Sequence, residues 1–254
     1  MRKIALISTI TLVTLSAFAG KNMQFNRSLN LSADRLSAVE FDVGAGSLEI
    51  VGTSGDEIKI NATIESDDFR DMENLVEYFE NKMKFSIERQ SEYAMVYAKS
   101  KESFNWGKSK NVMIHLQVEL PKDMDLEVDD GSGSMTIENI GGMVAIDDGS
   151  GTITLRNIAN DVEVEDGSGS LFMDNIQGDV SIEDGSGTIE LKRISGSVTV
   201  EDGSGGIHAT DVGGNFRVDD GSGEIEVKQL HGRFKLVDDG SGSVYVNGEK
   251  WDKK

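Results

Sequence analysis

Apolar and polar residues alternate along the chain from residue 126 to residue 246. Alternation with a period of two predicts β-strands that turn one face to the core and the other to solvent. The stretches are short and are separated by Gly, Ser, Asp and Asn, which favour turns. The apolar residues that we expect to point inward are Met135/Ile137, Ile153/Leu155, Leu171/Met173, Ile189/Leu191, Ile207/Ala209, Ile225/Val227 and Val244/Val246, with Val144/Ile146, Val162/Val164, Val180/Ile182, Val198/Val200, Phe216/Val218 and Phe234/Leu236 between them.

The alternating stretches recur at a fixed interval. The motif Asp-Gly-Ser-Gly occurs seven times, with five intervals of 18 residues and a last one of 19, and each unit divides into two nine-residue halves. A constant period of this size is typical of stacked repeats. We therefore predict an all-β fold, a parallel β-solenoid of 18-residue coils with two short strands each. An antiparallel meander would also alternate, but its hairpins do not usually hold one register over six units.

Residues 20–125 are less regular, and we expect an irregular β-rich part there. The stretch from Asp42 to Ile50 is a weak copy of the repeat. Strand-like alternation follows at residues 56–64, 92–99 and 112–120. We assign residues 126–247 to the repeat array and residues 248–254 to a C-terminal tail.

One segment of this N-terminal part has helical periodicity. We predict a short amphipathic helix near residues 67–84 that caps the solenoid, with Ser66 as its N-cap. Its apolar positions are Phe69, Met72, Leu75, Val76, Phe79 and Met83. Residues 101–110, which include Phe104 and Trp106, are expected to form a loop.

Each Gly-Ser-Gly turn follows two acidic residues, and the second is always Asp. This strict preference predicts a short carboxylate that accepts a hydrogen bond from the backbone N–H two residues further on. The glycines would supply positive φ or close backbone approach. Calcium is the alternative, because a divalent cation would relieve repulsion between stacked carboxylates. Calcium-binding β-rolls need a further Asp where this chain is apolar, so we assign no metal or cofactor; the calcium candidates are Asp130, Asp148, Asp166, Asp184, Asp202, Asp220 and Asp239.

The second turn of each unit has its own column of residues. Its members are Asn139, Asn157, Asn175, Arg193, Asp211 and Gln229. The three Asn side chains are predicted to stack as an amide ladder, which is a structural role.

No segment predicts an active site. The three histidines, His115, His208 and His231, are far apart in sequence and are interpreted as solvated side chains. The Gly-Ser-Gly turn lacks both the nucleophile elbow of hydrolases and the Lys of a phosphate-binding loop. Paired carboxylates in every coil leave a carbohydrate-active enzyme as an alternative, although such an enzyme usually has one distinctive coil.

The N-terminus predicts export. Residues 1–19 have a basic start, an apolar stretch and the cleavage signal Ala17-Phe18-Ala19, which is typical of a secretory signal peptide. An uncleaved anchor is the alternative, but the stretch is short for a bilayer span. We predict a periplasmic or extracellular protein with no transmembrane segment in the mature chain. Its formal charge of −20 argues against nucleic acid as a partner.

The chain resembles the DUF4097 family at Leu120-Pro121-Lys122, at the segment from Leu126 through Asp-Asp-Gly-Ser-Gly, and in the coils that follow. That family comprises β-strand-repeat, adhesin-like proteins of bacterial envelopes. The resemblance implies a β-solenoid, an exported or envelope location and a non-catalytic role. It transfers no ligand residues.

We therefore expect a non-catalytic exported envelope protein that acts as a scaffold or an adhesin-like binding module. Its partner would be an envelope protein or a glycan that the sequence does not identify. Its long faces would present outward residues such as Thr154, Arg156, Glu190, Lys192, Glu226 and Lys228. The alternatives are a carbohydrate-active β-helix enzyme and a divalent-cation-binding acidic solenoid.

Overall fold

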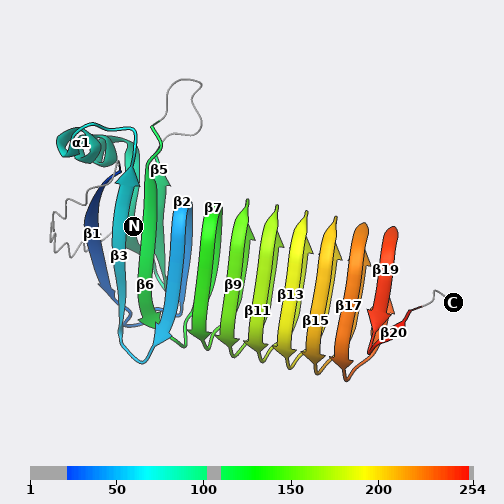
Figure 1. Ribbon diagram of the computed structural model, residues 1–254. Coiled ribbons are helices and arrows are strands. Elements are labelled where there is room, and N and C mark those ends of the chain that lie inside the picture. The colour runs from blue at the N-terminus through cyan, green and yellow to red at the C-terminus, as the bar shows by residue number, and fades with distance from the viewer. Residues whose placement is uncertain (1–21, 102–109, 252–254) are drawn as a thin grey trace.

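The computed structural model describes residues 22–101 and 110–251, so the expected signal peptide and most of the expected loop with Phe104 and Trp106 lie outside the described residues. The molecule is an elongated stack of coils, with the N-terminal strands and one helix gathered at one end (Figure 1). One face of the stack consists of β9 (Gly151–Ile158), β11 (Gly169–Ile176), β13 (Gly187–Ile194), β15 (Gly205–Val212), β17 (Ser222–Leu230) and β19 (Ser241–Val246). The other face consists of β8 (Val144–Asp148), β10 (Val162–Asp166), β12 (Val180–Asp184), β14 (Val198–Asp202), β16 (Phe216–Asp220) and β18 (Phe234–Leu236).

Every coil pairs with its neighbours in parallel and in the expected register. Val162 pairs with Val144 on one side and with Val180 on the other, so successive partners are one 18-residue unit apart. The predicted parallel β-solenoid is confirmed, and the meander is wrong for the repeat array. The 18-residue spacing returns the chain to the same face after two strands and two turns, which is why identical positions stack.

The core is a continuous column of the side chains that alternation places inside. All the predicted inward residues from Met135 to Val227 are buried, and Ile153 and Leu155 are 0% exposed. The exceptions lie in the last coil, where Phe234, Leu236 and Val246 are only half-buried. Aromatic rings cover this end: Phe234 stacks on Phe216 with ring centroids 6.0 Å apart and meets Trp251 edge-on at 4.9 Å.

The N-terminal strands extend the same stack. The long strand β2 (Ala38–Thr53) pairs in parallel with β7 (Asp125–Ile140), and Gly46 lies opposite Gly133. The weak copy of the repeat is therefore a coil. On its far side β2 pairs with β5 (Tyr93–Ser100) and then with β6 (Met113–Pro121).

Antiparallel strands then complete both faces. On one face β3 (Glu57–Ser66) joins β6, and β1 (Met23–Ser32) joins β3. On the other, β4 (Met83–Arg89) joins β5. The sequence patterns predicted β3, β5 and β6 but neither β1 nor β4.

The helix α1 (Met72–Lys82) is shorter than expected and has a different cap. Asp71 is the N-cap, because its Oδ1 accepts a hydrogen bond of 2.9 Å from the Asn74 N–H. The prediction of Ser66 was wrong: Ser66 is the buried last residue of β3, and its hydroxyl bonds to the Asn111 carbonyl oxygen. Met83 does not belong to the helix but begins β4.

Two buried side chains fix α1 to the end of the stack. Leu75 and Phe79 are buried, and the Phe79 ring meets Phe25 of β1 edge-on with centroids 5.3 Å apart. The helix contacts β1 and β4, which are the last strands of the two faces. It therefore lies across the N-terminal opening of the core, where an uncovered end would expose apolar side chains. In the described parts of the chain, no helix has the length and apolar character needed to span a bilayer.

Candidate functional site

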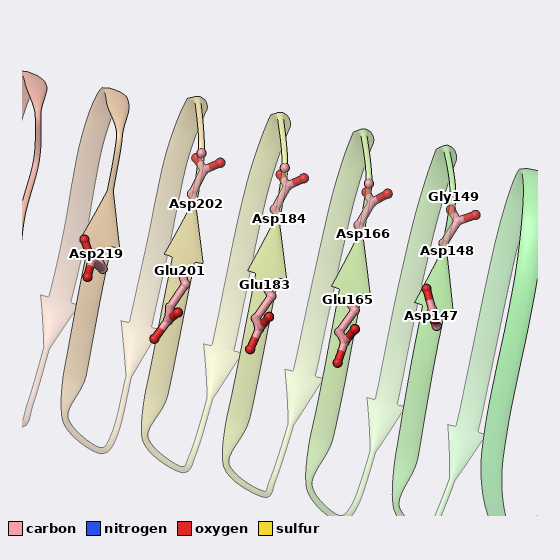
Figure 2. A pocket seen from close by; sticks show the side chains of 13 residues that line it. Asp147, Asp148, Gly149, Glu165, Asp166, Glu183, Asp184, Glu201, Asp202 and Asp219 are labelled. Carbon is pink, nitrogen blue, oxygen red and sulfur yellow. The ribbon is translucent and has the colours of Figure 1, made fainter.

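The most repetitive feature is the acidic corner, which we define as the two acids before each Gly-Ser-Gly turn. Strand alternation continues into this turn: in β10, Val164 is buried, Glu165 is exposed and Asp166 is buried. The first acid of each pair therefore points outward and the second points into the corner, so that the two acids form separate rows along the coils (Figure 2). The inner row is 1–5% exposed and contains Asp130, Asp148, Asp166, Asp184, Asp202 and Asp220.

Each inner Asp closes its own turn. The Oδ1 atom of Asp166 accepts a hydrogen bond of 2.9 Å from the Ser168 N–H, and the other five make the same bond at 2.9–3.2 Å. The predicted hydrogen bond is confirmed at these six positions. It also agrees with the absence of Glu from this row, because this turn hydrogen bond is characteristic of the short side chains of Asp and Asn.

The glycines are required by close approach between coils. Gly151 has φ of +150°, and a Cβ atom there would lie 1.7 Å from the Gly133 carbonyl oxygen. The first glycine of the turn is also crowded, since a Cβ on Gly149 would lie 2.6 Å from the Gly131 oxygen. Both expected reasons for glycine therefore apply in this turn.

The second carboxylate oxygen of several inner Asp residues lacks a partner. The Oδ2 atoms of Asp166, Asp202 and Asp220 are buried and make no hydrogen bond. Burial, with smaller contributions from neighbouring Asp residues, raises the pKa of Asp130, Asp148 and Asp202 to about 6. The pKa values of Asp166, Asp184 and Asp220 are raised as well, chiefly by burial. The carboxyl groups of the inner row are therefore protonated more readily than that of an ordinary Asp.

The outer acids line a shallow groove of about 620 Å³ along β8, β10, β12, β14 and β16. Within residues 22–101 and 110–251, no three His, Cys, Asp or Glu side chains are grouped so as to hold a metal ion. Asp239, the seventh calcium candidate, departs from the inner row because the last interval has an extra residue. It is half-buried, and Asp238 accepts the hydrogen bonds of that turn instead.

The opposite face presents a different set of side chains, which we call the ladder face. One outward column of it contains Thr154, Phe172, Glu190, His208, Glu226 and Tyr245, which lie opposite one another in register. The next outward column contains Arg156, Asp174, Lys192, Thr210 and Lys228. A hollow of about 200 Å³ lies around Phe172, between Thr154, Arg156, Glu190 and Lys192. The sequence predicted that these residues point outward but not this hollow.

The amide ladder predicted for the three Asn residues of the second-turn column is confirmed. Asn157 Nδ2 donates to Asn139 Oδ1 at 3.0 Å, and Asn175 Nδ2 donates to Asn157 Oδ1 at 2.8 Å. All members of this column, including Arg193 and Gln229, have φ between +52° and +63°. Asn tolerates this left-handed conformation better than most residues, so the ladder and the turn geometry favour the same residue.

Each histidine lies near a carboxylate rather than in solvent alone. His115 accepts a hydrogen bond of 3.1 Å at Nδ1 from the Ser47 N–H, its Nδ1 lies 3.0 Å from the Ser47 hydroxyl, and its Nε2 is 3.8 Å from Glu65. This set resembles a nucleophile with its base, which sequence spacing could not reveal because three separate strands supply it. The same Nδ1 already accepts the backbone N–H, and the hollow beside Ser47 is about 10 Å³, which leaves no room for a substrate.

The coils, the capped end and the repeated corner define a non-globular class, the parallel β-solenoids with short coils. The family model Toastrack DUF4097 matches residues 36–237, and the chain belongs to this family. The expected resemblance is therefore confirmed.

Two solved structures are distantly similar to this chain. A candidate cell adhesion protein from Clostridium sporogenes is 10% identical, with 88% of this chain and 99% of that chain covered and a TM-score of 0.41. A candidate adhesin from Parabacteroides merdae is 11% identical, with 87% and 95% covered and a TM-score of 0.30. Both similarities are distant, and we transfer no function from either. No curated protein matches the chain.

Proposed function

We propose that this protein is a non-catalytic, exported binding module of the cell envelope, with the solenoid as its scaffold. The observation that carries the proposal is the contrast between the inside and the ladder face. The inward positions and the corner repeat almost unchanged from coil to coil, whereas the outward side chains of the ladder face change from each coil to the next. A rigid support that displays a varied row of side chains is suited to recognising an extended partner.

A pull-down from envelope extracts tests this proposal. Immobilised mature protein should retain a specific protein or glycan, and substitution of ladder-face residues should release it. The matched control is substitution of Glu163 on β10 and Thr199 on β14, which point outward from the face opposite the ladder face; we call this second face, formed by the even-numbered strands from β8 to β18, the acidic face. A protein that retains nothing from any extract would contradict the proposal.

Export is proposed on the pattern of residues 1–19. Expression of the full chain in a bacterium followed by cell fractionation tests it. We expect a periplasmic or secreted product whose first residue is Gly20. A full-length product that stays in the cytoplasm would show that the segment does not direct export.

Cation binding along the acidic corner is the second candidate, favoured by the unpartnered oxygens of Asp166, Asp202 and Asp220. Protonation is the alternative to a ligand, because the raised pKa of Asp202, about 6, makes this oxygen easier to protonate than that of an ordinary Asp. Isothermal calorimetry with calcium at neutral pH separates the two. An absence of heat at millimolar calcium would eliminate the cation.

A carbohydrate-active enzyme would need one distinctive coil. In the described residues, the inner Asp and its turn hydrogen bond have the same geometry in six coils. If the protein is an enzyme, replacing the acid pair should abolish activity in one particular coil and should have no effect in the others. We expect no such coil.

A further inference from the structure

From β11 to β19, one outward column of the ladder face repeats every two coils, which is twice the period of the core. Aromatic rings stand on alternate strands, with Phe172 on β11, His208 on β15 and Tyr245 on β19. The strands between them, β13 and β17, carry Glu190 and Glu226 in the same column. The inside of the solenoid does not require this alternation, because inward residues repeat with every coil.

The charged strands are internally paired. Lys192 Nζ lies 2.5 Å from Glu190 Oε1, and Lys228 Nζ lies 2.8 Å from Glu226 Oε2. The two residues of each pair lie on the same strand, and each pair links the two outward columns. The ladder face is therefore a series of ring rows separated by rows of hydrogen-bonding groups.

The charge of this face differs from that of the rest of the molecule. The outward positions from β9 to β17 within the strands contain three cations and four anions, a balance close to neutral: Arg156, Lys192, Lys228, Asp174, Glu190, Glu224 and Glu226. The acidic face, by contrast, exposes at least one carboxylate in every coil. In a chain with a net charge of −20, the ladder face is the long surface that suits an uncharged polar polymer.

The spacing of the aromatic rings along the stack fits one kind of polymer. Adjacent parallel strands are about 4.8 Å apart, so rings on alternate strands are about 9.6 Å apart along the stack. In an extended β-1,4-linked glycan successive sugars are turned over, so that equivalent sugar faces recur once per disaccharide, a length comparable with two coils. Aromatic rings bind sugars by stacking against the apolar face of the pyranose, and charged side chains bind the hydroxyl groups.

We propose that an uncharged β-1,4-linked glycan binds along the ladder face, parallel to the solenoid axis. Phe172, His208 and Tyr245 each stack on one sugar, and the three sugars are every second one along the glycan. The pairs Glu190/Lys192 and Glu226/Lys228 hydrogen-bond the sugars that lie between. The inference rests on the proposed binding function and specifies its ligand. The row from Phe172 to Tyr245 spans four coil spacings, about 19 Å, which accommodates four to five sugars.

Titration of the intact mature protein with defined oligosaccharides tests this inference. The probes are the β-1,4-linked hexamers of glucose and of N-acetylglucosamine, with the α-1,4-linked glucose hexamer as the control. We expect at least one β-1,4 hexamer to bind at least ten times more tightly than its dimer and than the α-linked hexamer. Failure of both β-1,4 hexamers to bind, or equal binding of the α-linked chain, would overturn the inference.

Variants locate the site. Replacing Phe172, His208 and Tyr245 together by Ala should weaken hexamer binding at least tenfold, while Glu163→Ala with Thr199→Ala on the acidic face should leave it unchanged. Each single Ala variant serves as a second measurement if the triple variant fails to fold. Equal losses on the two faces would contradict the site. If envelope extracts yield a protein partner that depends on Phe172 and no glycan binds, the binding function stands and the glycan inference fails.

Discussion

At the residue scale, two backbone requirements repeat through the stack and explain which residues the turns accept. The second glycine of the corner faces a carbonyl oxygen of the preceding coil and, in every coil from Gly133 to Gly223, has positive φ. The second-turn column holds one left-handed residue per coil, which is Asn in three of the coils but also Arg193 and Gln229. The corner position accepts only glycine, because a backbone oxygen of the preceding coil fills the space that a Cβ atom would need. The second-turn position accepts several side chains and only prefers Asn.

Two adjacent glycines in one coil separate these effects. A Cβ atom on Gly205 would lie 1.7 Å from the Gly187 oxygen, whereas one on Gly206 would meet only the end of the His208 ring at 3.3 Å. We expect Gly205→Ala to lower the free energy of unfolding by more than about 3 kcal/mol and Gly206→Ala to change it by less than about 1 kcal/mol. Urea denaturation followed by circular dichroism measures both. Equal effects would show that the corner can relax.

The left-handed column offers a stabilising change. Gln229 has φ of +52°, and Asn adopts this conformation at lower cost. We expect Gln229→Asn to raise the free energy of unfolding by about 0.5–1 kcal/mol. The reverse substitution, Asn157→Gln, should lower it, because it also disturbs the amide ladder. A loss of stability in Gln229→Asn would contradict this explanation.

At the element scale, each short strand owes its position to strict alternation, which also explains how far sequence reasoning could go. In β10, every second residue from Val162 through Val164 points inward, and the same alternation continued by two residues predicts that Asp166 is buried. Alternation therefore predicts the inward residues, and the constant repeat predicts which of them stack. Packing in three dimensions decides the rest. Asp71 displaces Ser66 as the helix cap because Ser66 is committed to β3, and His115 meets Ser47 only because β6 lies beside β2.

The inner Asp row makes stability depend on pH. The pKa of Asp202 is raised from 3.8 to about 6, so the folded state binds protons more tightly than the unfolded chain. As far as this row is concerned, stability should therefore be highest below about pH 4, should fall as pH rises through about 6, and should level off above that. Melting temperatures between pH 5 and pH 7.5 test the sign, and a higher value at pH 7.5 would contradict it.

A single variant isolates this effect. Asp202→Asn keeps an oxygen that can accept the Ser204 N–H but removes the buried charge. We expect it to stabilise the protein at pH 7.5 by about 1 kcal/mol and to reduce the dependence of the melting temperature on pH. The exposed neighbour Glu201→Gln is the control. A structural cation would give the opposite result, because removal of a ligand would destabilise the protein at neutral pH.

At the scale of the whole molecule, stability depends on contacts between neighbouring coils and on what covers the two ends. No coil buries its apolar side chains alone, since each lies between the coil before and the coil after. At the N-terminal end α1 covers β1 and β4. At the C-terminal end Phe234 and Trp251 meet over the last core residues. The array therefore behaves as one cooperative unit.

The N-terminal end is tested at Phe79. Replacing this buried residue by Ala removes its contacts with Phe25 and Phe85, and should cost about 3–5 kcal/mol. It should also expose the end of the stack, so we expect more self-association in light scattering. Glu77→Ala, on the exposed side of α1, is the control. A fully monomeric and stable Phe79→Ala variant would show that the helix is dispensable.

The extra residue in the last interval has a consequence for growth. A stack of identical coils can in principle extend without limit, and a free edge on the last coil could pair with another copy of the chain. Here the nineteenth residue of the last interval displaces Asp239 from the inner Asp row. In addition, β20 (Glu249–Lys250) pairs antiparallel with the end of β19. β20 therefore occupies the edge of β19 at Tyr245 and Val246, where a strand of a second molecule would otherwise be able to pair.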